Sequence, residues 1–467
     1  MKNEFVPRAA AGLLGAAALA GAPSAHAATC SASNPVFISG ASVAQPIVQA
    51  LAKAVAPLGI SIIYTNPDSC LGLEDLLVNQ TSTETGSKTL IMGASGAGGN
   101  TACTLSATQT PDIAISEVYA STCGFGSDAG TSALAEVLGP VNAMVFAVPG
   151  GTTNASSATS ISAEAAQVVF GYDANTYIVQ PWNQSANIFV REQTSGSEAM
   201  IGVAIDLPTS EWVNAATSAT PPAQQKGTST AMETAIVGGA TSNPSATIGI
   251  LGSENVYSYN ASSPSVPLNI LAYQHTGQSC GYFPSSTGAA LDEINVRQGR
   301  YAIWGPTHVY AHLDGSGNLT SPNTPSDVSA VAAVLNFFIA TGESPDTTSL
   351  YSIGSLAAGG VDSGTIGADG GVTISTADKQ AFIAAEINPG YVVPWCAMEV
   401  LRTGEVGPEA SYQSPEPCSC LFEVTASGAP IAGHTCTACP NGDSDCTGTS
   451  SSGTPTPTCR YGYCEVQ

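Results

Sequence analysis

Basic residues are scarce in this 467-residue chain. It carries 11 Lys and Arg against 35 Asp and Glu, so the formal net charge is −24 at pH 7. Such a charge repels polyanions, which argues against nucleic acid or an anionic membrane as a partner. Any site for a small anion must therefore be built locally, around one of the few arginines.

Charged residues of both signs make up only 10% of the chain, and long hydrophobic runs are missing, although hydrophobic residues make up 43%. A membrane-spanning helix needs about 20 consecutive apolar residues, and no run in the mature chain reaches that length. The chain is long enough for about two or three domains with sizeable cores. We predict a monomer without a membrane span, and we assign it no cofactor and no metal.

Histidine is also rare, with five in the chain. His26 lies in the leader and His434 in the C-terminal region, which leaves His275, His308 and His312 as candidate general bases. We therefore predict that the protein is not an enzyme and keep a secreted hydrolase as the less favoured alternative.

The N-terminus, residues 1–27, has the pattern of a cleavable signal peptide. Lys2 and Arg8 precede a short apolar segment over 9–22, and Ala25-His26-Ala27 provides small residues at the cleavage site. We predict export to the periplasm, the medium or the cell surface, with cleavage after Ala27.

The 13 cysteines indicate disulfides in an exported protein, and the odd number leaves at least one without an intramolecular partner. Cys103 and Cys123 flank a polar stretch after the Gly-rich loop 93–99, and we expect them to pair. That loop lacks the lysine and spacing of a phosphate-binding P-loop.

From residue 413 the composition changes to Pro, Ser, Gly, Thr and seven cysteines between Cys418 and Cys464. Too few large apolar residues remain for a core, so cross-links must hold this tail together. Cys436 and Cys439 with His434 have a spacing that zinc also accepts, but export favours disulfides. Asp443 and Asp445 resemble only a fragment of a calcium loop.

Several short apolar runs lead into polar turns and then into helical patterns. We predict strands at 36–38, 60–64 and 113–115, and a further one at 186–190 before Arg191. Alternating strands and helices predict a parallel sheet, whose ligands bind at the carboxyl ends of the strands. The turns after these strands can therefore converge on one ligand.

The segment Arg191 to Ser197 reads Arg-Glu-Gln-Thr-Ser-Gly-Ser. Ser195 and Glu198 have the spacing of a capping box, as do Ser42 and Gln45, so a helix is expected to begin at each place. A helix start offers free backbone N–H groups, and a guanidinium adds charge-assisted donors. This segment predicts a site for a small oxyanion, against the simpler interpretation of a helix cap beside a surface arginine.

Taken together, these motifs resemble the PstS-like phosphate-binding proteins of bacterial ABC uptake systems, a branch of the type II periplasmic binding proteins. The likeness is patchy and covers residues 34 to 400. The segments that resemble the family are Ser39-Gly40-Ala41-Ser42-Val43, Asp68-Ser69-Cys70-Leu71-Gly72, Ser116-Glu117, Arg191 to Ser197, the segments around 227–229 and 246–250, and 301–310. The resemblance implies a two-lobed α/β fold with two chain crossings, to which the Cys-rich irregular tail is an addition.

The resemblance also implies the ligand-binding residues. They are Ser42, Val43, Ser69, Glu117, Arg191, Gln193, Ser195, Gly196 and Ser197. Two positions depart from the family pattern, because Gln193 and Glu117 stand where the family has Asp. Gln offers N–H donors as well as an acceptor, so the choice between phosphate, sulfate and another oxyanion stays open.

We expect a first lobe formed by 28–145 and 306–412, a second lobe formed by 146–305, and a disulfide-bonded tail at 413–467. The favoured function is capture of phosphate or a similar tetrahedral oxyanion, with an ABC permease as the partner. The alternative is a cell-surface structural or adhesion protein that reuses this fold, since a fold does not fix a function.

Overall fold

The structure is a computed structural model. It describes residues 28–78, 89–93, 99–105, 109–125, 134–151, 155–174, 176–213, 223–314, 316–322, 328–340, 380, 384, 392–431, 434–447 and 456–466. The predicted signal peptide and most of the Gly-rich loop 93–99 lie outside the described residues.

One mixed sheet runs through the molecule. Its strand order is β1-β5-β4-β3-β2-β6-β12-β7-β10, with β9 paired to β7. The strands are β1 (Ala28–Thr29), β2 (Pro35–Gly40), β3 (Ser61–Thr65), β4 (Thr89–Met92), β5 (Thr101–Thr104), β6 (Ile113–Ser116), β7 (Leu134–Pro149), β9 (Gly249–Gly252), β10 (Leu268–Ile270) and β12 (Trp304–His312). The three strands that lead to the candidate site, β2, β3 and β6, are parallel as predicted, whereas β12 is antiparallel to β6 and β7.

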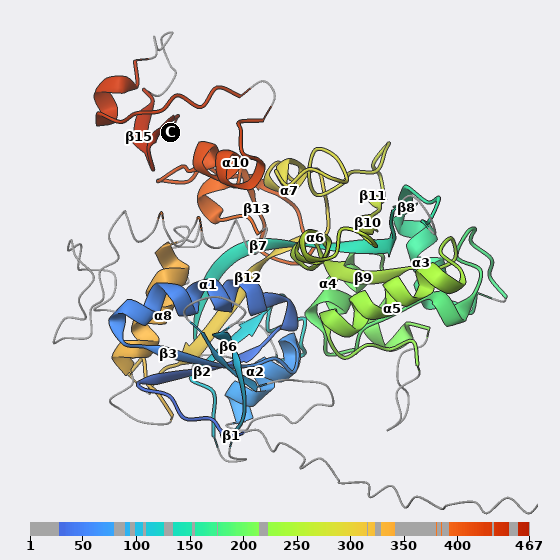
Figure 1. Cartoon of the computed structure of the whole chain (residues 1–467), viewed down its shortest axis with the longest axis horizontal. Coiled ribbons are helices and arrows are strands. Elements are labelled where there is room, and N and C mark those ends of the chain that lie inside the picture. Colours follow the sequence, from blue (N-terminus) through green and yellow to red (C-terminus); the bar gives the residue numbers. More distant parts are fainter. Residues whose placement is uncertain are drawn as a thin grey trace, which may run out of the picture.

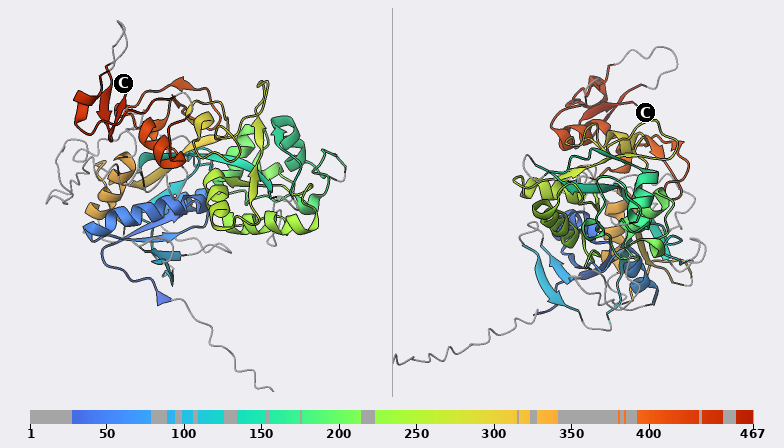
Figure 2. Two further views of the ribbon diagram at one scale, coloured as in Figure 1. Left: turned by 45° about the horizontal axis from the view of Figure 1, so that its top comes forward. Right: turned by 90° about the vertical axis from the view of Figure 1, so that its right-hand side faces the viewer.

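Strand β7 joins the two halves of the molecule. It has 16 residues, pairs with β12 over much of its length, and continues into pairing with β9 and β10. Figure 1 and the left view of Figure 2 show the blue first lobe and the green second lobe side by side. The chain leaves the first lobe on β7 and returns on β12, so the predicted two-lobed α/β fold with two crossings is confirmed. The predicted boundary between 145 and 146 falls inside β7.

The first lobe packs helices on the parallel strands. They are α1 (Gln45–Val55), α2 (Ser69–Val78) and α8 (Val328–Ala340), with the 3-10 turns η1 (Ser42–Ala44) and η2 (Ala56–Leu58) at the ends of α1. Helix α1 buries Ile47, Val48, Leu51 and Val55, the face that the sequence spacing predicts. Helix α2 packs on β2 and β6, and α8 packs on α1 and β7. This packing fixes the carboxyl ends of the parallel strands, where the candidate site lies.

The second lobe is built mainly from helices around β9 and β10. Its elements also include β8 (Ser160–Ser162), α3 (Ala163–Gly171), η5 (Ser185–Asn187), α4 (Gly196–Ala204), η6 (Thr209–Glu211), α5 (Ser229–Ser242), α6 (Ser253–Ser262) and β11 (Ala272–Gln274). The predicted strand at 186–190 is wrong as a regular strand: η5 occupies its start, and Ile188 and Val190 make isolated bridges to Ile248 and Gln225. Isolated β-bridges at single residues, rather than a continuous strand, therefore position the backbone that leads to Arg191.

Six disulfides cross-link the described chain: Cys30–Cys103, Cys70–Cys123, Cys396–Cys418, Cys420–Cys436, Cys439–Cys459 and Cys446–Cys464. The predicted Cys103–Cys123 bridge is wrong, because β5 brings Cys103 beside β1 while α2 brings Cys70 to Cys123. Cys280 is the free thiol and is exposed. In the tail, Cys436 and Cys439 enter separate disulfides, so their spacing is not that of a zinc site.

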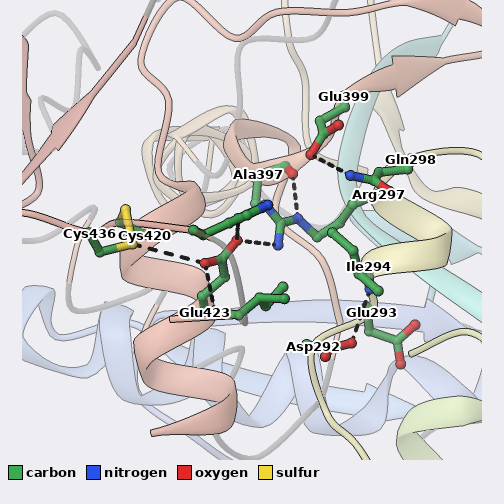
Figure 3. Close-up of polar contacts among 12 residues, drawn as sticks. Asp292, Glu293, Ile294, Arg297, Gln298, Ala397, Glu399, Cys420, Glu423 and Cys436 are labelled. Atoms are coloured by element: carbon green, nitrogen blue, oxygen red, sulfur yellow. Dashed lines mark hydrogen bonds and ion pairs between the residues drawn. A yellow bond between two sulfur atoms is a disulfide. The ribbon is translucent and has the colours of Figure 1, made fainter. Parts of the chain in front are cut away.

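The C-terminal part of the chain is anchored on the rest of the molecule. Its elements are η8 (Trp395–Ala397), β13 (Val400–Leu401), β14 (Ala410–Ser411), α10 (Ser419–Ser427), η9 (Gly442–Asp445), β15 (Thr458–Arg460) and β16 (Tyr463–Glu465). It is anchored in part on the short helix α7 (Ile294–Arg297), which lies before the return strand β12. Arg297 on α7 donates to Glu423 on α10 at 3.0 Å and to the Ala397 carbonyl at 2.8 Å (Figure 3). Both charged side chains of this ion pair are fully buried.

The segment before the tail also reaches the first lobe. Glu405 accepts hydrogen bonds from the Tyr119 amide at 2.6 Å and from the Thr122 hydroxyl at 2.7 Å. Arg402 lies over the Trp304 ring at 3.5 Å and donates to the Ala302 carbonyl. Among the described residues, the helices lack the combination of length and apolar character needed to cross a bilayer.

Candidate functional site

Arg191 lies at the centre of the contact between the lobes and is 1% exposed. Backbone hydrogen bonds between Val190 and residues 224 and 226 place the side chain beside the start of α5. The guanidinium donates to the carbonyls of Lys226 at 2.8 Å and Gly227 at 3.1 Å. Two main-chain acceptors thus hold the planar group in one orientation.

The remaining guanidinium contacts are to hydroxyls from both lobes. Nη2 lies 3.4 Å from Ser42 Oγ of the first lobe, and Nη1 lies 3.5 Å from Ser229 Oγ of the second. The two hydroxyls are 3.3 Å apart. Within the described part of the chain, no carboxylate forms an ion pair with Arg191. Burial lowers the pKa of Arg191, while the charges of Asp68, Glu192 and Glu198 raise it. Among the described residues, the arginine is therefore a buried cation without a direct counter-ion, an arrangement that favours an anionic ligand.

The turns after β2 and β3 supply the first-lobe part of the site. Ser42 lies in η1 and Ser69 is the first residue of α2. Gly40 has φ +154°, and a Cβ there would overlap the Ile115 carbonyl of β6. Only glycine fits this junction, which packs the turn before Ser42 against β6.

Glu117 follows β6 and meets Ser69. Its backbone N–H donates to Ser69 Oγ at 3.3 Å, and its Oε2 accepts from Asn142 of β7 at 3.4 Å. The other carboxyl oxygen, Oε1, is buried without a hydrogen-bond partner among the described residues. Burial raises the pKa of Glu117 to about 7, and the Asn142 amide and the charge of His308 oppose that rise. Near neutral pH this carboxyl can therefore accept a proton from a ligand or donate one to it.

Gly196, the first residue of α4, brings the second lobe against these turns. A Cβ at this position would overlap Ser69 Oγ and lie 2.9 Å from Ser69 Cβ and 3.0 Å from Glu117 Cβ. Next to it, the Thr194 carbonyl accepts from the Cys70 amide at 3.1 Å, and the Thr194 hydroxyl donates to Asp68 at 2.6 Å. The two lobes thus meet through a glycine contact that any larger residue would prevent.

The other predicted ligand residues lie on the same turns. Ser195 and Ser197 are each 2% exposed at the start of α4, Val43 is 2% exposed in η1, and Gln193 is half-buried. Helix α4 begins where predicted, but the capping box does not form, because Glu198 accepts from the Arg191 amide instead. The Ser42 hydroxyl likewise contacts Arg191 and Ser229 rather than capping a helix.

Some residues of the site were missed in the sequence. Ser229 opens α5 behind the N-cap Thr228, which accepts from the Ala231 amide. The available sequence signal was the pair of hydroxyl residues, Thr228 and Ser229, that follows a glycine. Only the fold shows that the Ser229 hydroxyl reaches Arg191. Asn142 lies in an apolar run of β7, and a single polar residue in such a run gives no sequence signal of a binding role.

Glu254 adds a second buried carboxyl near Glu117. Burial raises its pKa well above the ordinary value, the charge of Glu117 raises it further, and the Asn142 amide opposes the rise. Glu254 is fully buried on α6, and neither of its carboxyl oxygens accepts a hydrogen bond within the normal distance from the residues described. Burial thus favours the neutral form of this carboxyl over its ionised form.

A cavity of about 350 Å³ opens beside the hydroxyl pair. It lies between α1 of the first lobe and α5 and α6 of the second. Its lining residues are Ser42, Gln45, Pro46, Gln49, Lys53, Asn66, Asn100, Thr228, Ser229, Thr230, Glu233, Asn255, Ser258, Tyr259 and Ser262. The hydroxyls of Ser42 and Ser229 thus connect the buried guanidinium to this space.

Two of the histidines considered as general bases have side-chain partners, whereas Nε2 of His312 is buried without a hydrogen-bond partner among the described residues. His308 Nδ1 lies 2.6 Å from Glu136 and its ring packs on Tyr119, while His275 contacts the Tyr273 hydroxyl. In the regions that the structure covers, the side chains of His275, His308 and His434 are hydrogen-bonded to a tyrosine hydroxyl and to two carboxylates. None of these three histidines is hydrogen-bonded to a serine hydroxyl or a thiol of the described residues, the pairing that nucleophilic catalysis uses.

Known proteins resemble this chain in structure but not in sequence. No protein-family model matches the chain, and no curated protein matches it. A phosphate-binding protein from Stenotrophomonas maltophilia aligns with 78% of this chain and 91% of its own, at 14% identity and TM-score 0.38. PstS from Borrelia burgdorferi aligns over 59% and 86%, at 15% identity and TM-score 0.31.

The reduced OxyR regulatory domain from Pseudomonas aeruginosa is also similar, over 65% of this chain and 96% of its own, at 7% identity and TM-score 0.32. Phosphate-binding proteins are thus among the structural neighbours of this chain, at low sequence identity. Alignments this loose assign no ligand and no residue role to this chain.

Proposed function

We propose that the protein is a solute-binding protein that closes its two lobes on a tetrahedral oxyanion such as phosphate. The observation that carries the proposal is the buried Arg191 guanidinium, which lacks a direct carboxylate partner among the described residues and touches hydroxyls of both lobes. Serine hydroxyls and helix-start amides complete such a site with further donors. The ligand roles of Ser42, Val43, Ser69, Glu117, Arg191, Gln193, Ser195, Gly196 and Ser197 are part of this proposal.

Selectivity follows from which groups face the anion. A carboxylate with an ordinary pKa repels an anion that carries no proton, whereas a neutral carboxyl can donate to it. With a pKa of about 7, Glu117 adopts either form near neutral pH. We therefore propose that phosphate binds in both of its physiological protonation states and that sulfate is rejected less strongly than by a site with an ordinary Asp.

Export and delivery to a permease are the biological part of the proposal. Six disulfides in the described chain support an oxidising compartment. A closed two-lobed carrier presents one surface to a transporter when loaded and another when empty, which suits an ABC permease as partner. The alternative adhesive role is less supported, because the part of the tail that is described packs on the body through Arg297 and Glu423 rather than extending as a free arm.

Isothermal titration of phosphate and of sulfate into the mature protein tests the proposal. We expect saturable binding of phosphate, and we expect Arg191→Met to abolish it while leaving the far-ultraviolet circular dichroism unchanged. Arg300→Met on the exposed turn after α7 is the matched control and is expected to bind normally. No heat with either anion for the native protein, or unchanged binding by Arg191→Met, would overturn it.

A further inference from the structure

The cavity beside the candidate anion site is larger than an inorganic anion needs. It measures about 350 Å³, whereas a water molecule takes up about 30 Å³ and phosphate only a few times that volume. Sites for organic ligands begin at about 300 Å³. The space between α1, α5 and α6 therefore has room for a ligand with a body as well as an anionic group.

One end of the cavity is suited to the anionic group. Ser42 and Ser229 line it, and Arg191 lies directly behind them. Because arginine only donates hydrogen bonds, at least one of the serine hydroxyls keeps its own proton for a ligand acceptor. The 14-residue helix α5 begins at this end, so the partial positive charge of its N-terminus adds to that of the guanidinium.

Away from this end, the wall carries hydrogen-bond acceptors that have no donor. Gln49 Oε1 and Asn255 Oδ1 are buried and have no hydrogen-bond partner among the residues that the structure describes. The side chains are 8% and 9% exposed, and both line the cavity. Gln49 Nε2 donates to the Gly93 carbonyl at 2.5 Å, which fixes its amide so that the oxygen is the free atom. Two buried acceptors from opposite lobes call for donor groups on the ligand, since an unsatisfied buried polar atom is costly.

The remaining lining residues are mostly uncharged, with Lys53 and Glu233 as the two charged members. Amides and hydroxyls predominate, with Tyr259 as the single aromatic ring and Pro46 as the single other apolar side chain among the lining residues. Glu233 places a carboxyl at the same wall, a third acceptor when ionised. The amide and hydroxyl groups of this wall match the hydroxyls of a polyol or sugar.

We propose that the ligand is a phosphomonoester of a small polyol or sugar, with its phosphate at Arg191, Ser42 and Ser229 and its hydroxyls donating to Gln49 and Asn255. The inference rests on the proposed function, because it places the phosphate at the same arginine. It adds the ligand class, since inorganic phosphate leaves both free acceptors without donors.

The test is titration calorimetry of the native protein with inorganic phosphate, glycerol 3-phosphate, glucose 6-phosphate and free glucose. We expect at least one of the two phosphomonoesters to bind tenfold or more tightly than inorganic phosphate, and glucose alone not to bind. Binding of phosphate with equal or higher affinity than both esters overturns the inference and leaves the proposed function standing. If neither phosphate nor either ester binds, both proposals fall.

Two variants separate the ligand body from its phosphate. Gln49→Met keeps the size of the side chain but removes the free acceptor, and Asn255→Leu does the same on α6. Each is expected to weaken the phosphomonoester about tenfold, the effect of one hydrogen bond, and to leave inorganic phosphate within twofold. Ser258→Ala, on a lining hydroxyl without an assigned role, is the control for folding and for local repacking. Equal losses for ester and phosphate, or none for either, contradict the assignment.

Discussion

At the scale of single residues, the site depends on a glycine as much as on an arginine. Gly196 lets α4 approach Ser69 and Glu117 so closely that a Cβ would overlap Ser69. The approach brings the backbone amides at the start of α4 to the turns of the first lobe. Small size at one position is therefore what permits the lobes to close.

Gly196→Ala is expected to weaken phosphate binding by tenfold or more, because the methyl group holds the lobes apart. The fold should tolerate the change, since alanine favours a helix more than glycine does. Gly238→Ala in α5, where an added Cβ meets nothing within 4 Å, is the matched control. Titration calorimetry measures both, and equal affinities for the two variants would contradict the role of the contact.

Glu117 predicts a pH dependence of stability. Its pKa is raised to about 7 in the folded protein from an ordinary value of 4.5, so the unfolded chain loses this proton first as the pH rises. The native state is thus not penalised by this carboxyl below pH 4.5. Between pH 4.5 and pH 7 the free energy of unfolding falls, by about 3 kcal/mol for this shift in pKa. Glu254 and Glu293, whose pKa values are also raised by burial, act in the same direction.

Chemical denaturation at a series of pH values measures this effect. Glu117→Gln is expected to show a shallower loss of stability between pH 4.5 and 7 than the native protein, since the amide cannot ionise. Glu211→Gln, an exposed position on η6, should keep the native slope. A slope unaltered by Glu117→Gln would show that this carboxyl is not buried as described.

At the scale of elements, the tail is held to the body by a buried ion pair. Arg297 of α7 and Glu423 of α10 are both fully buried, and Arg297 also donates to the Ala397 carbonyl (Figure 3). Removing one partner of such a pair leaves an uncompensated charge and costs about 3–5 kcal/mol, whereas replacing both by apolar residues is far less harmful. Docking of α10 is therefore expected to depend on the pair rather than on either residue.

Glu423→Leu is expected to loosen the tail, and adding Arg297→Met should restore much of the stability. Limited proteolysis of the mature protein reports this as early cleavage between the body and α10 in the single variant and protection in the double variant. Gln298→Ala, at a partly exposed neighbouring position, is the control. If the single and double variants are cut equally fast, the ion pair is not what anchors the tail.

The sequence was informative wherever a signal was local. Apolar runs followed by polar turns predicted β2, β3 and β6, and the geometry of parallel strands implied that the turns of Ser42, Ser69 and Glu117 meet. The capping boxes at Ser42 and Ser195 were wrong, because tertiary contacts to Arg191 and from its backbone replaced the local ones. Helix starts are thus easier to predict than the hydrogen bonds that satisfy them.

Contacts between segments far apart in the chain could not be predicted from the sequence. Ser229 reaches Arg191 only because residues 224 and 226 pair with Val190. The prediction of the disulfide partners was wrong for the same reason, since the pairing of Cys30 with Cys103 depends on β1 lying beside β5. The cavity had no sequence signal, because its wall consists of ordinary polar residues on three helices and their connecting turns.

At the scale of the whole molecule, the two lobes share β7 and β12, and further cross-links constrain the rest. The disulfide between Cys70 and Cys123 ties the start of α2 to the turn after β6, close to Ser69 and Glu117. It lies in the part of the first lobe that meets Gly196. The first-lobe half of the site is thus held together covalently, so in the proposed function the hinge motion falls to β7 and β12.

One free thiol per molecule is expected, at Cys280. Alkylation of the unfolded, unreduced protein followed by peptide mass analysis should label this cysteine alone and show the six pairs described. Cys280→Ser should then take up no label. Labelling at Cys103 or Cys123, or a Cys103–Cys123 peptide, would contradict the arrangement of β1, β5 and α2.

The central claim is that a tetrahedral anion binds against Arg191 between the lobes. A crystal structure grown with arsenate tests it most directly, because arsenic gives an anomalous signal that marks the position of the anion. We predict one strong peak within hydrogen-bonding reach of the Arg191 guanidinium and the Ser42 hydroxyl, flanked by the start of α4. A peak only at surface positions, or none when the lobes are closed, would contradict the account.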